Sequence, residues 1–238
     1  MKRAMVTVAL AMGALVTLTG AGPGANKPAK PVARGNWVAT AAVTPQGYHV
    51  LGNQAAPLRL VEYVSYTCPH CAQFEVQSEA QLKIGLVGLG KGAVEIRNFV
   101  RDPIDMTVAL LTNCVAPARF FPLHTAFMRN QAKWIVPATN STEAQRQRWS
   151  TGPFVNRTRA IASDFKFYEF MEARGVNRVA TERCLANETL AKKLAAQTQE
   201  AVEKYNVNGT PSFMLDGVLL AGTHDWASLK PQLDARVR

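Results

Sequence analysis

Two cysteines separated by two residues form the part of the chain best suited to chemistry. Cys68 and Cys71 enclose Pro69 and His70, and they follow an apolar run from Leu58 to Tyr66. Cysteines at this spacing can exchange electrons through a reversible disulfide, or they can bind a metal or a haem. The residues around them decide between these uses.

A metal or haem site agrees poorly with the rest of the sequence. A zinc ribbon needs a second Cys-x-x-Cys or a Cys/His pair, whereas Cys114 and Cys184 stand alone. A c-type haem needs a histidine directly after the second cysteine, where Ala72 stands. Two buried structural thiols remain an alternative. We predict a redox site without a metal or other cofactor, because a strand, a cysteine pair and a helix follow one another as in thioredoxin-like proteins.

The elements on either side of the pair position the first thiol. The run Leu58 to Tyr66 has the composition of a strand that is buried on both faces. Pro69 suits the first position of a helix, so Cys68 should lie at a helix N-terminus. Unpaired N–H groups and the helix dipole favour a thiolate there, which predicts a pKa between about 3.5 and 7.5 instead of the usual value of about 8.5. Cys71, one turn further on, should be the more buried thiol.

The sequence Cys68-Pro69-His70-Cys71 after Val61-Glu62-Tyr63 resembles the active site of the DsbA family of thioredoxin-fold oxidoreductases. Three further stretches agree with this resemblance, namely residues 52–57, Gly209-Thr210-Pro211 and Asp216-Gly217. They correspond to the lead-in to the first core strand, the cis-proline loop and a hairpin turn. The resemblance implies an α/β, thioredoxin-like fold with an inserted helical domain.

The resemblance also assigns roles to residues near the pair. Cys68 and Cys71 would be the redox pair, with His70 favouring the Cys68 thiolate and Pro69 shaping the helix start. Glu62 shares a strand face with apolar residues, and it corresponds to an acidic residue buried beneath the active site in DsbA-like proteins. Burial would raise its pKa and make it a proton acceptor for Cys71. The alternative is an exposed glutamate at a sheet edge.

Four more residues receive roles through the same resemblance. Thr210 and Pro211 would form a cis-proline loop that faces the cysteine pair and binds substrate peptide as an added strand. Cys114 and Cys184 lie where many DsbA-like sequences of this subtype carry cysteines, and we predict a structural disulfide between them. Closing a loop of about 70 residues would stabilise the fold by about 4 kcal/mol. Two buried, separated thiols are the alternative.

The other elements follow from local patterns. Residues 94–100 predict a second strand that pairs in parallel with the first, and Asp225 suits the N-cap of the last helix. Asp216-Gly217 between two apolar runs predicts a hairpin. His49 is expected to be exposed on a short edge strand. His124 is expected in an apolar helical environment, bonded to a backbone carbonyl.

The chain divides into three segments. Residues 1–21 have the pattern of a signal peptide, with basic residues followed by the apolar stretch Ala4 to Leu18. A retained anchor is the alternative, although about 15 apolar residues fall short of the roughly 20 that span a bilayer. Residues 22–45, rich in proline and glycine, predict a flexible linker. Residues 46–238 form the DsbA-like domain, with a helical insertion at about 104–186.

The expected export and the net charge indicate the compartment and the partners of the protein. Four cysteines in an exported chain are expected as two oxidised pairs. We expect a bacterial periplasm, because a glycan on the sequon at Asn208 would obstruct Pro211 and no ER-retention sequence ends the chain. The net charge of +10 includes one dense cluster of arginines, Arg146, Arg148, Arg157 and Arg159. Without a nucleic-acid-binding motif beside it, this cluster predicts a solvated helical face and no nucleic-acid partner.

These observations predict an exported dithiol oxidase, a thiol:disulfide oxidoreductase that passes the Cys68–Cys71 disulfide to reduced, unfolded protein substrates. A membrane or soluble redox partner would reoxidise the pair. An isomerase or reductase of the same fold is the alternative, because a threonine at position 210 also resembles disulfide isomerases. A peptide-binding chaperone with incidental cysteines is a third possibility.

Overall fold

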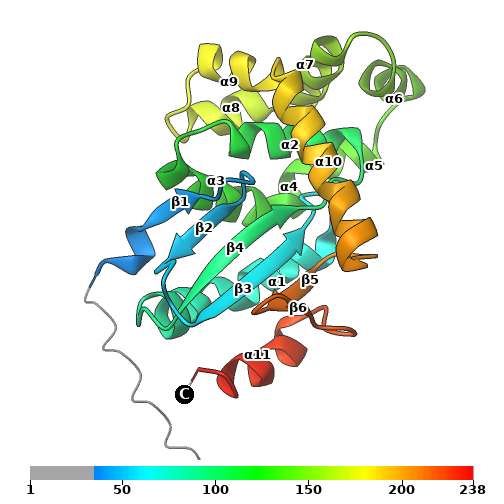
Figure 1. Ribbon diagram of the computed structural model, residues 1–238. Coiled ribbons are helices and arrows are strands. Elements are labelled where there is room, and N and C mark those ends of the chain that lie inside the picture. The colour runs from blue at the N-terminus through cyan, green and yellow to red at the C-terminus, as the bar shows by residue number, and fades with distance from the viewer. Residues whose placement is uncertain (1–34, 238) are drawn as a thin grey trace, which may run out of the picture. The chain divides into compact units, whose positions relative to one another are not determined.

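Six strands in the order β1-β2-β4-β3-β5-β6 form one sheet within residues 35–237, the part of the chain that the computed structural model describes (Figure 1). Their bounds are β1 Ala41–Val43, β2 His49–Gly52, β3 Leu58–Val64, β4 Gly92–Asn98, β5 Ser212–Leu215 and β6 Val218–Leu219. The predicted signal peptide and the linker up to residue 34 lie outside the described residues.

The central strands are β3 and β4, which pair in parallel from Leu58 opposite Gly92 to Val64 opposite Asn98. Six of the seven residues of β3 are buried, as a strand covered on both faces requires. On its other side, β3 pairs antiparallel with β5. The turn from β5 to β6 is the predicted hairpin, with positive φ at Asp216 and Gly217.

Helices cover the sheet and extend beyond it. The bounds are η1 Trp37–Ala39, α1 Pro69–Leu82, η2 Lys83–Val87, α2 Pro103–Asn113, α3 Pro117–Arg129, α4 Gln131–Trp134, α5 Val136–Thr139, α6 Glu143–Ser150, α7 Phe154–Asp164, α8 Phe167–Glu172, α9 Arg178–Leu185, α10 Glu188–Tyr205 and α11 Trp226–Asp234. The short element η1 is a 3-10 helix and η2 is a π-helical turn. Helices α2 to α9 occupy the range where the sequence predicted a helical insertion.

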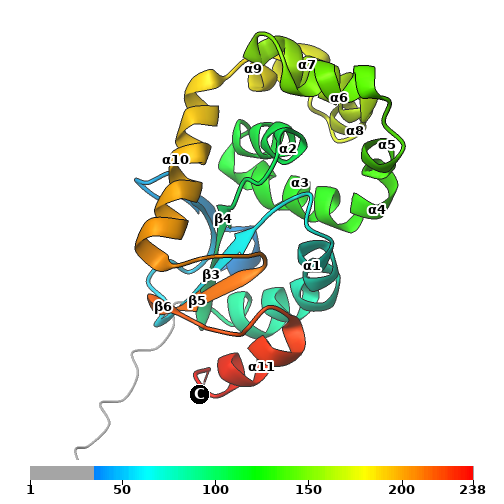
Figure 2. The same ribbon diagram turned by 90° about the vertical axis from the view of Figure 1, so that its right-hand side faces the viewer.

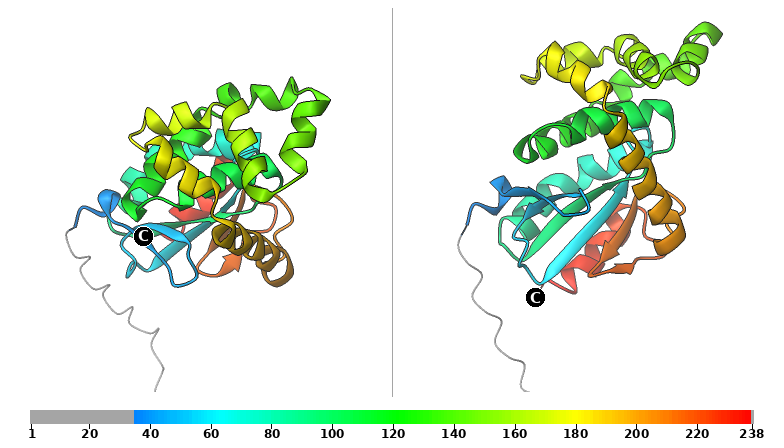
Figure 3. Two further views of the ribbon diagram at one scale, coloured as in Figure 1. Left: turned by 90° about the horizontal axis from the view of Figure 1, so that it is seen from above. Right: turned by 45° about the horizontal axis from the view of Figure 1, so that its top comes forward.

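The figures show how these helices are arranged. Helix α10 crosses one face of the sheet, and α1 and α11 lie on the other (Figures 1 and 2). Seen from above and from the tilted side, helices α6 to α9 gather beyond one end of the sheet (Figure 3). A mixed sheet with helices on both faces and this strand order is a thioredoxin-like fold that carries extra helices between β4 and α10.

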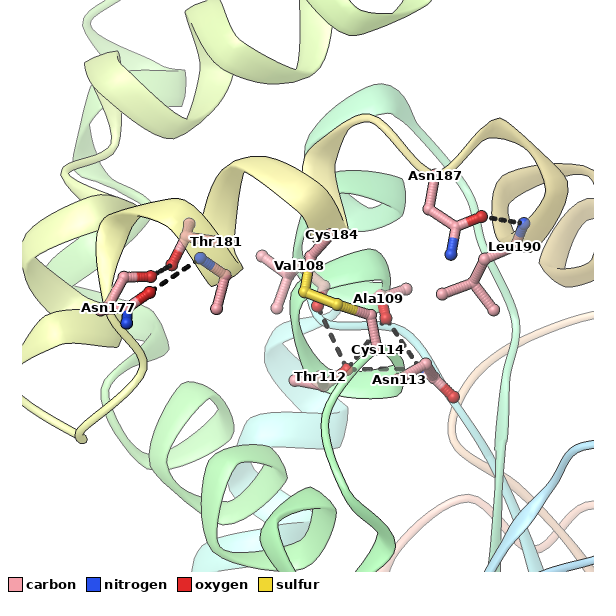
Figure 4. The surroundings of a disulfide bond; sticks show 11 residues. Val108, Ala109, Thr112, Asn113, Cys114, Asn177, Thr181, Cys184, Asn187 and Leu190 are labelled. Atoms are coloured by element: carbon pink, nitrogen blue, oxygen red, sulfur yellow. Dashed lines mark hydrogen bonds between the residues drawn. A yellow bond between two sulfur atoms is a disulfide. The ribbon is translucent and has the colours of Figure 1, made fainter.

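A disulfide fixes the added helices to each other. Cys114 follows α2 and Cys184 lies in α9, and the two are bonded with Cα atoms 5.5 Å apart, across 70 residues of sequence (Figure 4). The predicted pairing is therefore confirmed. Figure 4 shows the bond running from Cys184 in the α9 ribbon to Cys114 at the end of α2.

Two predictions for the N-terminal part were wrong. Residues 37–43, assigned to the flexible linker, form η1 and β1, because β1 pairs antiparallel with β2 and Ala41 packs against the core. His49 was expected to be exposed, yet only 3% of its surface is accessible. Its ring stacks on Phe120 of α3 at 3.7 Å, so the insertion covers a strand that would otherwise face solvent.

Candidate active site

Cys68 lies where β3 gives way to α1. Its backbone is extended and it is the N-cap of α1, with Pro69 at the first helical position. The Cys68 thiol donates a hydrogen bond to the carbonyl oxygen of Thr210, 3.2 Å away. Cys68 and Cys71 are both free thiols here, and they expose 2% and 1% of their surfaces. Cys71 is the more deeply enclosed of the two, as predicted, because burial dominates its electrostatics whereas hydrogen bonding dominates those of Cys68.

The electrostatics of the two thiols do differ. A hydrogen bond from the Cys71 side chain is the largest cause that lowers the pKa of Cys68, to about 5. Burial opposes this shift, while the side chain of Thr210, the backbone N–H of Cys71 and the charge of Arg101 support it. Burial raises the pKa of Cys71 well above its usual value, and the neighbouring Cys68 raises it further. One thiol is thus poised to ionise and the other to stay protonated.

His70 lies in the first turn of α1, between the two cysteines. Its side chain is exposed, and it makes no hydrogen bond with Cys68 among the described residues. The causes that lower the pKa of Cys68 lie instead in Cys71, Thr210 and Arg101. A direct effect of His70 on the thiolate remains a prediction. The position of Pro69 at the helix start agrees with the role predicted for it.

The Thr210–Pro211 loop lies against the cysteine pair, and its peptide bond is cis as predicted. A groove of about 600 Å³ runs beside it, lined by His70, Phe74, Asn208, Thr210, Pro211 and His224 among others. His224 contacts the carbonyl oxygen of Pro211 at 2.8 Å, which links the loop to the start of α11. The Thr210 hydroxyl is buried without a hydrogen-bond partner of ordinary geometry among the described residues, so it is free to donate to a thiolate.

Glu62 is buried on β3, as predicted, with 2% of its surface accessible. Burial raises its pKa well above the usual value, and the nearby Glu75 raises it further. Both carboxyl groups line a cavity of about 30 Å³, which is large enough for one water molecule. Neither carboxyl forms a hydrogen bond with Cys71 among the described side chains, so the predicted proton transfer would need a bridging group.

Glu75 was not identified from the sequence, nor was its link to His124. Burial raises the pKa of Glu75 and lowers the pKa of His124 to about 3. The imidazole of His124 is therefore uncharged at neutral pH, and its 3.7 Å contact with the Glu75 carboxyl is not an ion pair. His124 was predicted to be buried, and it is, but its Nδ1 partner is the Tyr66 hydroxyl at 3.0 Å instead of a backbone carbonyl.

A second buried acid supports the loop before Cys68. Asp105 in α2 accepts hydrogen bonds from the Ser65 hydroxyl at 2.6 Å and from the backbone N–H of Tyr66 at 2.8 Å. Burial raises its pKa to about 7. Arg101 adds to this support, because its Nε donates to the Ser65 hydroxyl at 3.0 Å. No local pattern marks these residues, since charged residues near a helix start are usually exposed.

Gln131 connects the inserted helices to the same loop. Its side-chain nitrogen donates to the carbonyl oxygens of Tyr66 at 2.6 Å and of Cys68 at 2.9 Å. With Asp105 and Gln131, both from the insertion, the residues on either side of Thr67 have their backbone polar groups satisfied. The insertion thus holds the reactive cysteine in place.

Residues 35–237 contain neither a metal-binding cluster nor a membrane-spanning helix. Within that range, no group of three His, Cys, Asp or Glu side chains is arranged to hold a metal ion. Over the same residues, every helix is too short or too polar to cross a bilayer.

Comparisons with known proteins agree with the fold. A family model described as thioredoxin matches residues 44–235. A crystal structure of protein-disulfide isomerase from Novosphingobium aromaticivorans is 72% identical, with a TM-score of 0.79, over 81% of this chain and 98% of that one. The structure of α-DsbA1 from Wolbachia pipientis has a TM-score of 0.64 at 18% identity, over 82% and 93% of the two chains, and it supports the fold alone.

Among curated proteins, a Rickettsia conorii protein provisionally named a protein-disulfide oxidoreductase is 28% identical over 71% of this chain. The match spans 53% of the Rickettsia protein. The chain therefore spans about half the length of the curated relatives that it matches.

Proposed function

Because the chain belongs to the thioredoxin family and has the fold of DsbA-type proteins, we propose that it is a thiol:disulfide oxidoreductase and, more narrowly, an exported dithiol oxidase. The observation that carries this proposal is the difference in pKa between the two thiols at the start of α1. Burial keeps Cys71 protonated, whereas hydrogen bonds and a nearby positive charge favour the thiolate of Cys68.

The proposed reaction starts from the disulfide between Cys68 and Cys71. A substrate thiolate attacks the sulfur of Cys68, the bond to Cys71 breaks, and Cys71 leaves as a thiolate that takes up a proton. A second substrate thiolate then attacks the substrate sulfur of the mixed disulfide and releases Cys68 as a thiolate. The substrate has lost two electrons and gained a disulfide, and the protein is left with two reduced cysteines.

The low pKa of Cys68 supports the oxidising direction. A thiol with a pKa of about 5 is almost fully ionised at pH 7, whereas an ordinary thiol is not. The difference stabilises the reduced protein by about 3 kcal/mol at pH 7. For a two-electron couple this raises the reduction potential by about 60 mV, which makes the protein a stronger oxidant. Cys68 is also the better leaving group for the same reason.

The proton that Cys71 needs has a candidate source nearby. Burial raises the pKa of Glu62 and so favours its protonated form, which can donate a proton as Cys71 leaves. In the reverse direction the same carboxylate accepts the proton when Cys71 attacks a mixed disulfide. One water molecule in the cavity that Glu62 lines could carry the proton between them.

Substrates are proposed to be reduced, unfolded polypeptides that bind in the groove beside Thr210 and Pro211. The groove exposes His70, Asn208 and the edge of the cis-proline loop, and its volume of about 600 Å³ admits an extended peptide. We propose a periplasmic location, supported by the signal-like start of the sequence and by the disulfide between Cys114 and Cys184. A membrane or soluble partner would then reoxidise the pair.

Disulfide isomerase is the second candidate, favoured by the 72% identity to a structure of a protein-disulfide isomerase and by Thr210 before the cis-proline. The two activities differ in substrate and in redox state. An oxidase, supplied as the disulfide, converts a reduced two-cysteine peptide to its disulfide form. An isomerase, supplied as the dithiol, restores activity to a fully oxidised, scrambled protein.

The decisive experiment measures both activities together with the reduction potential against a glutathione series. We expect rapid oxidation of the peptide, little reactivation of the scrambled protein and a potential well above −200 mV, which is a range of strong oxidants. Efficient reactivation at a lower potential would assign isomerase. Replacing Cys68 and Cys71 by serine should abolish both activities, and retention of holdase activity alone would favour the chaperone.

A further inference from the structure

The arginine cluster of α6 and α7 contains one member that differs from the rest. Three of the four arginines have a carboxylate partner, and the pairs are Arg146–Glu143, Arg148–Asp164 and Arg159–Glu182. These three agree with a solvated, ion-paired helical face. The fourth, Arg157 in α7, has no ion pair and no side-chain hydrogen bond among the described residues.

The unpartnered guanidinium of Arg157 is partly enclosed. Its Nε is buried and lacks an acceptor among residues 35–237, and its Cζ lies 5.9 Å from the centroid of the Phe154 ring. Buried N–H groups almost always have an acceptor from the protein, from water or from a ligand. A charged donor makes the stronger hydrogen bond when that acceptor is an anion.

Arg157 borders an apolar pocket. The pocket has a volume of about 320 Å³, and its apolar lining includes Met106, Trp149, Phe154 and Ile161. Small-molecule and side-chain sites in proteins usually combine such a lining with one or two fixed polar groups. A ligand with an apolar group and an anionic group would pack against the apolar lining and pair with Arg157.

The pocket is linked to the reactive cysteine through Arg101, which also lines it. The Arg101 side chain donates from Nη2 to the hydroxyl of Thr67 at 3.3 Å, and Thr67 directly precedes Cys68. Asp102 lies in the same lining, but its carboxylate accepts from the Thr67 hydroxyl at 2.6 Å and caps α2. This carboxylate is engaged locally and does not pair with Arg157.

We propose that this pocket is a second substrate-binding site, which takes an apolar side chain next to a glutamate or aspartate in the polypeptide that reacts with Cys68. The apolar side chain packs against Trp149 and Phe154, and the carboxylate pairs with Arg157. The inference rests on the proposed function, because a reacting polypeptide is the ligand that brings such a segment close to Thr67. The pocket would make the protein prefer substrates that carry an apolar residue next to an acidic residue near the reacting cysteine.

The test compares two peptides with one cysteine each. One carries Phe-Glu a few residues from the cysteine, and the other carries Phe-Gln at the same place. Binding is measured by calorimetry with the protein in which Cys68 and Cys71 are both serine, so that no redox step is needed. The rate of mixed-disulfide formation is measured separately with the oxidised protein.

We expect the glutamate peptide to bind about tenfold more tightly than the glutamine peptide, the size of one charge-assisted hydrogen bond in a partly enclosed site. In Arg157→Gln this ratio should fall to about one. Arg159→Gln is the matched control, because Arg159 lies on the same helix but pairs with Glu182 outside the pocket, and it should keep the tenfold ratio.

Equal binding of the two peptides, or a ratio that survives Arg157→Gln, would overturn the inference. Binding of free 3-phenylpropionate as tightly as the peptide would also overturn it, since the pocket would then take a small organic acid. These outcomes are separate from the proposed function. A protein that binds the glutamate peptide selectively but whose oxidised form makes a mixed disulfide with neither peptide would contradict the function and leave the pocket standing.

Discussion

The thiol of Cys68 donates a hydrogen bond to the carbonyl oxygen of Thr210 at 3.2 Å, across 142 residues of sequence. The same threonine has a buried hydroxyl without a partner of ordinary geometry among the described residues. A carbonyl oxygen accepts a hydrogen bond from the thiol but cannot donate to a thiolate. The hydroxyl can donate, so this one residue offers a group to each ionisation state of Cys68.

Thr210→Val should therefore weaken the thiolate specifically. Loss of one donor to the thiolate is expected to raise the pKa of Cys68 by about one unit and to make the reduction potential about 30 mV more negative. The change is measured by absorbance titration of the thiolate and by equilibration with glutathione. Thr223→Val is the control, because the buried Thr223 hydroxyl already accepts from Gln232 and no contact to Cys68 is lost. An unchanged pKa in Thr210→Val would refute this role.

Glu62→Gln tests the proton donor. Because burial raises the pKa of Glu62 and so favours its neutral form, we expect little change in the pKa of Cys68. The step in which Cys71 leaves should slow by about 100-fold, since glutamine cannot donate a proton in this way. Stopped-flow measurement of mixed-disulfide formation checks this. Glu95→Gln is the control and should leave that rate unchanged. Glu95 is buried on β4, the strand next to that of Glu62, and it forms an ion pair with Arg97 of the same strand. A marked fall in the Cys68 pKa would show that Glu62 is ionised instead.

Replacing Cys114 and Cys184 together by serine should lower the free energy of unfolding by about 4 kcal/mol, because the unfolded chain loses a cross-link that closes a loop of 70 residues. Chemical denaturation of the oxidised proteins measures the difference. The reactivity of Cys68 with an alkylating reagent should not change, since its own contacts lie elsewhere. A loss well below this value would mean that the packed helices around the bond hold the insertion together without it.

His124 predicts an acid-dependent loss of stability. Its folded-state pKa of about 3 lies below the unfolded value of 6.5, so only the unfolded state takes up the proton as the pH falls below 6.5. Stability should drop towards about 1.4 kcal/mol per pH unit for this one group. Unfolding curves of wild type and His124→Gln between pH 7 and 4 give its contribution as the difference.

Two other buried groups titrate in the same range. The lowered pKa of His49 acts in the same direction as that of His124. Asp105 acts in the opposite direction, because its pKa is raised to about 7 and its protonated folded form gains stability as the pH falls from 7 to 4. The contribution of Asp105 cancels in the comparison with His124→Gln. That of His49 cancels only in part, because the charge of His124 is one of the causes that lower the pKa of His49. A variant with the same slope as the wild type would contradict the prediction.

Local patterns sufficed for the strand, cysteine pair and helix that make up the site. The apolar run that begins at Leu58 ends as strand β3, and Pro69 begins α1 as its fixed φ angle and missing N–H require. Asp225 caps the last helix, with its side chain accepting from the backbone N–H of Ser228. In each of these cases the deciding interaction is formed by neighbours in the sequence.

The remaining features depend on contacts between distant segments. His49 is buried because α3 covers β2, and no sequence pattern near His49 predicts that contact. Asp105 and Glu75 have the residue types of an exposed helix surface, and only the packing of α2 and α1 in the folded protein buries them. The position of His70 depends on which way its side chain leaves the first turn of α1. Such outcomes are set by tertiary packing, which a single sequence does not display.

The bonds from Gln131 to the carbonyl oxygens of Tyr66 and Cys68 bear on how far the protein can be simplified. A minimal thioredoxin made by excising residues between β4 and α10 would keep the cysteine pair but lose the donor for two backbone acceptors beside it. Grafting these helices onto another thioredoxin would supply the Gln131 donor, but it would have no partners unless two backbone carbonyl oxygens lay at the matching positions. The insertion and the active-site loop are therefore a single engineering unit, to be transplanted or redesigned together.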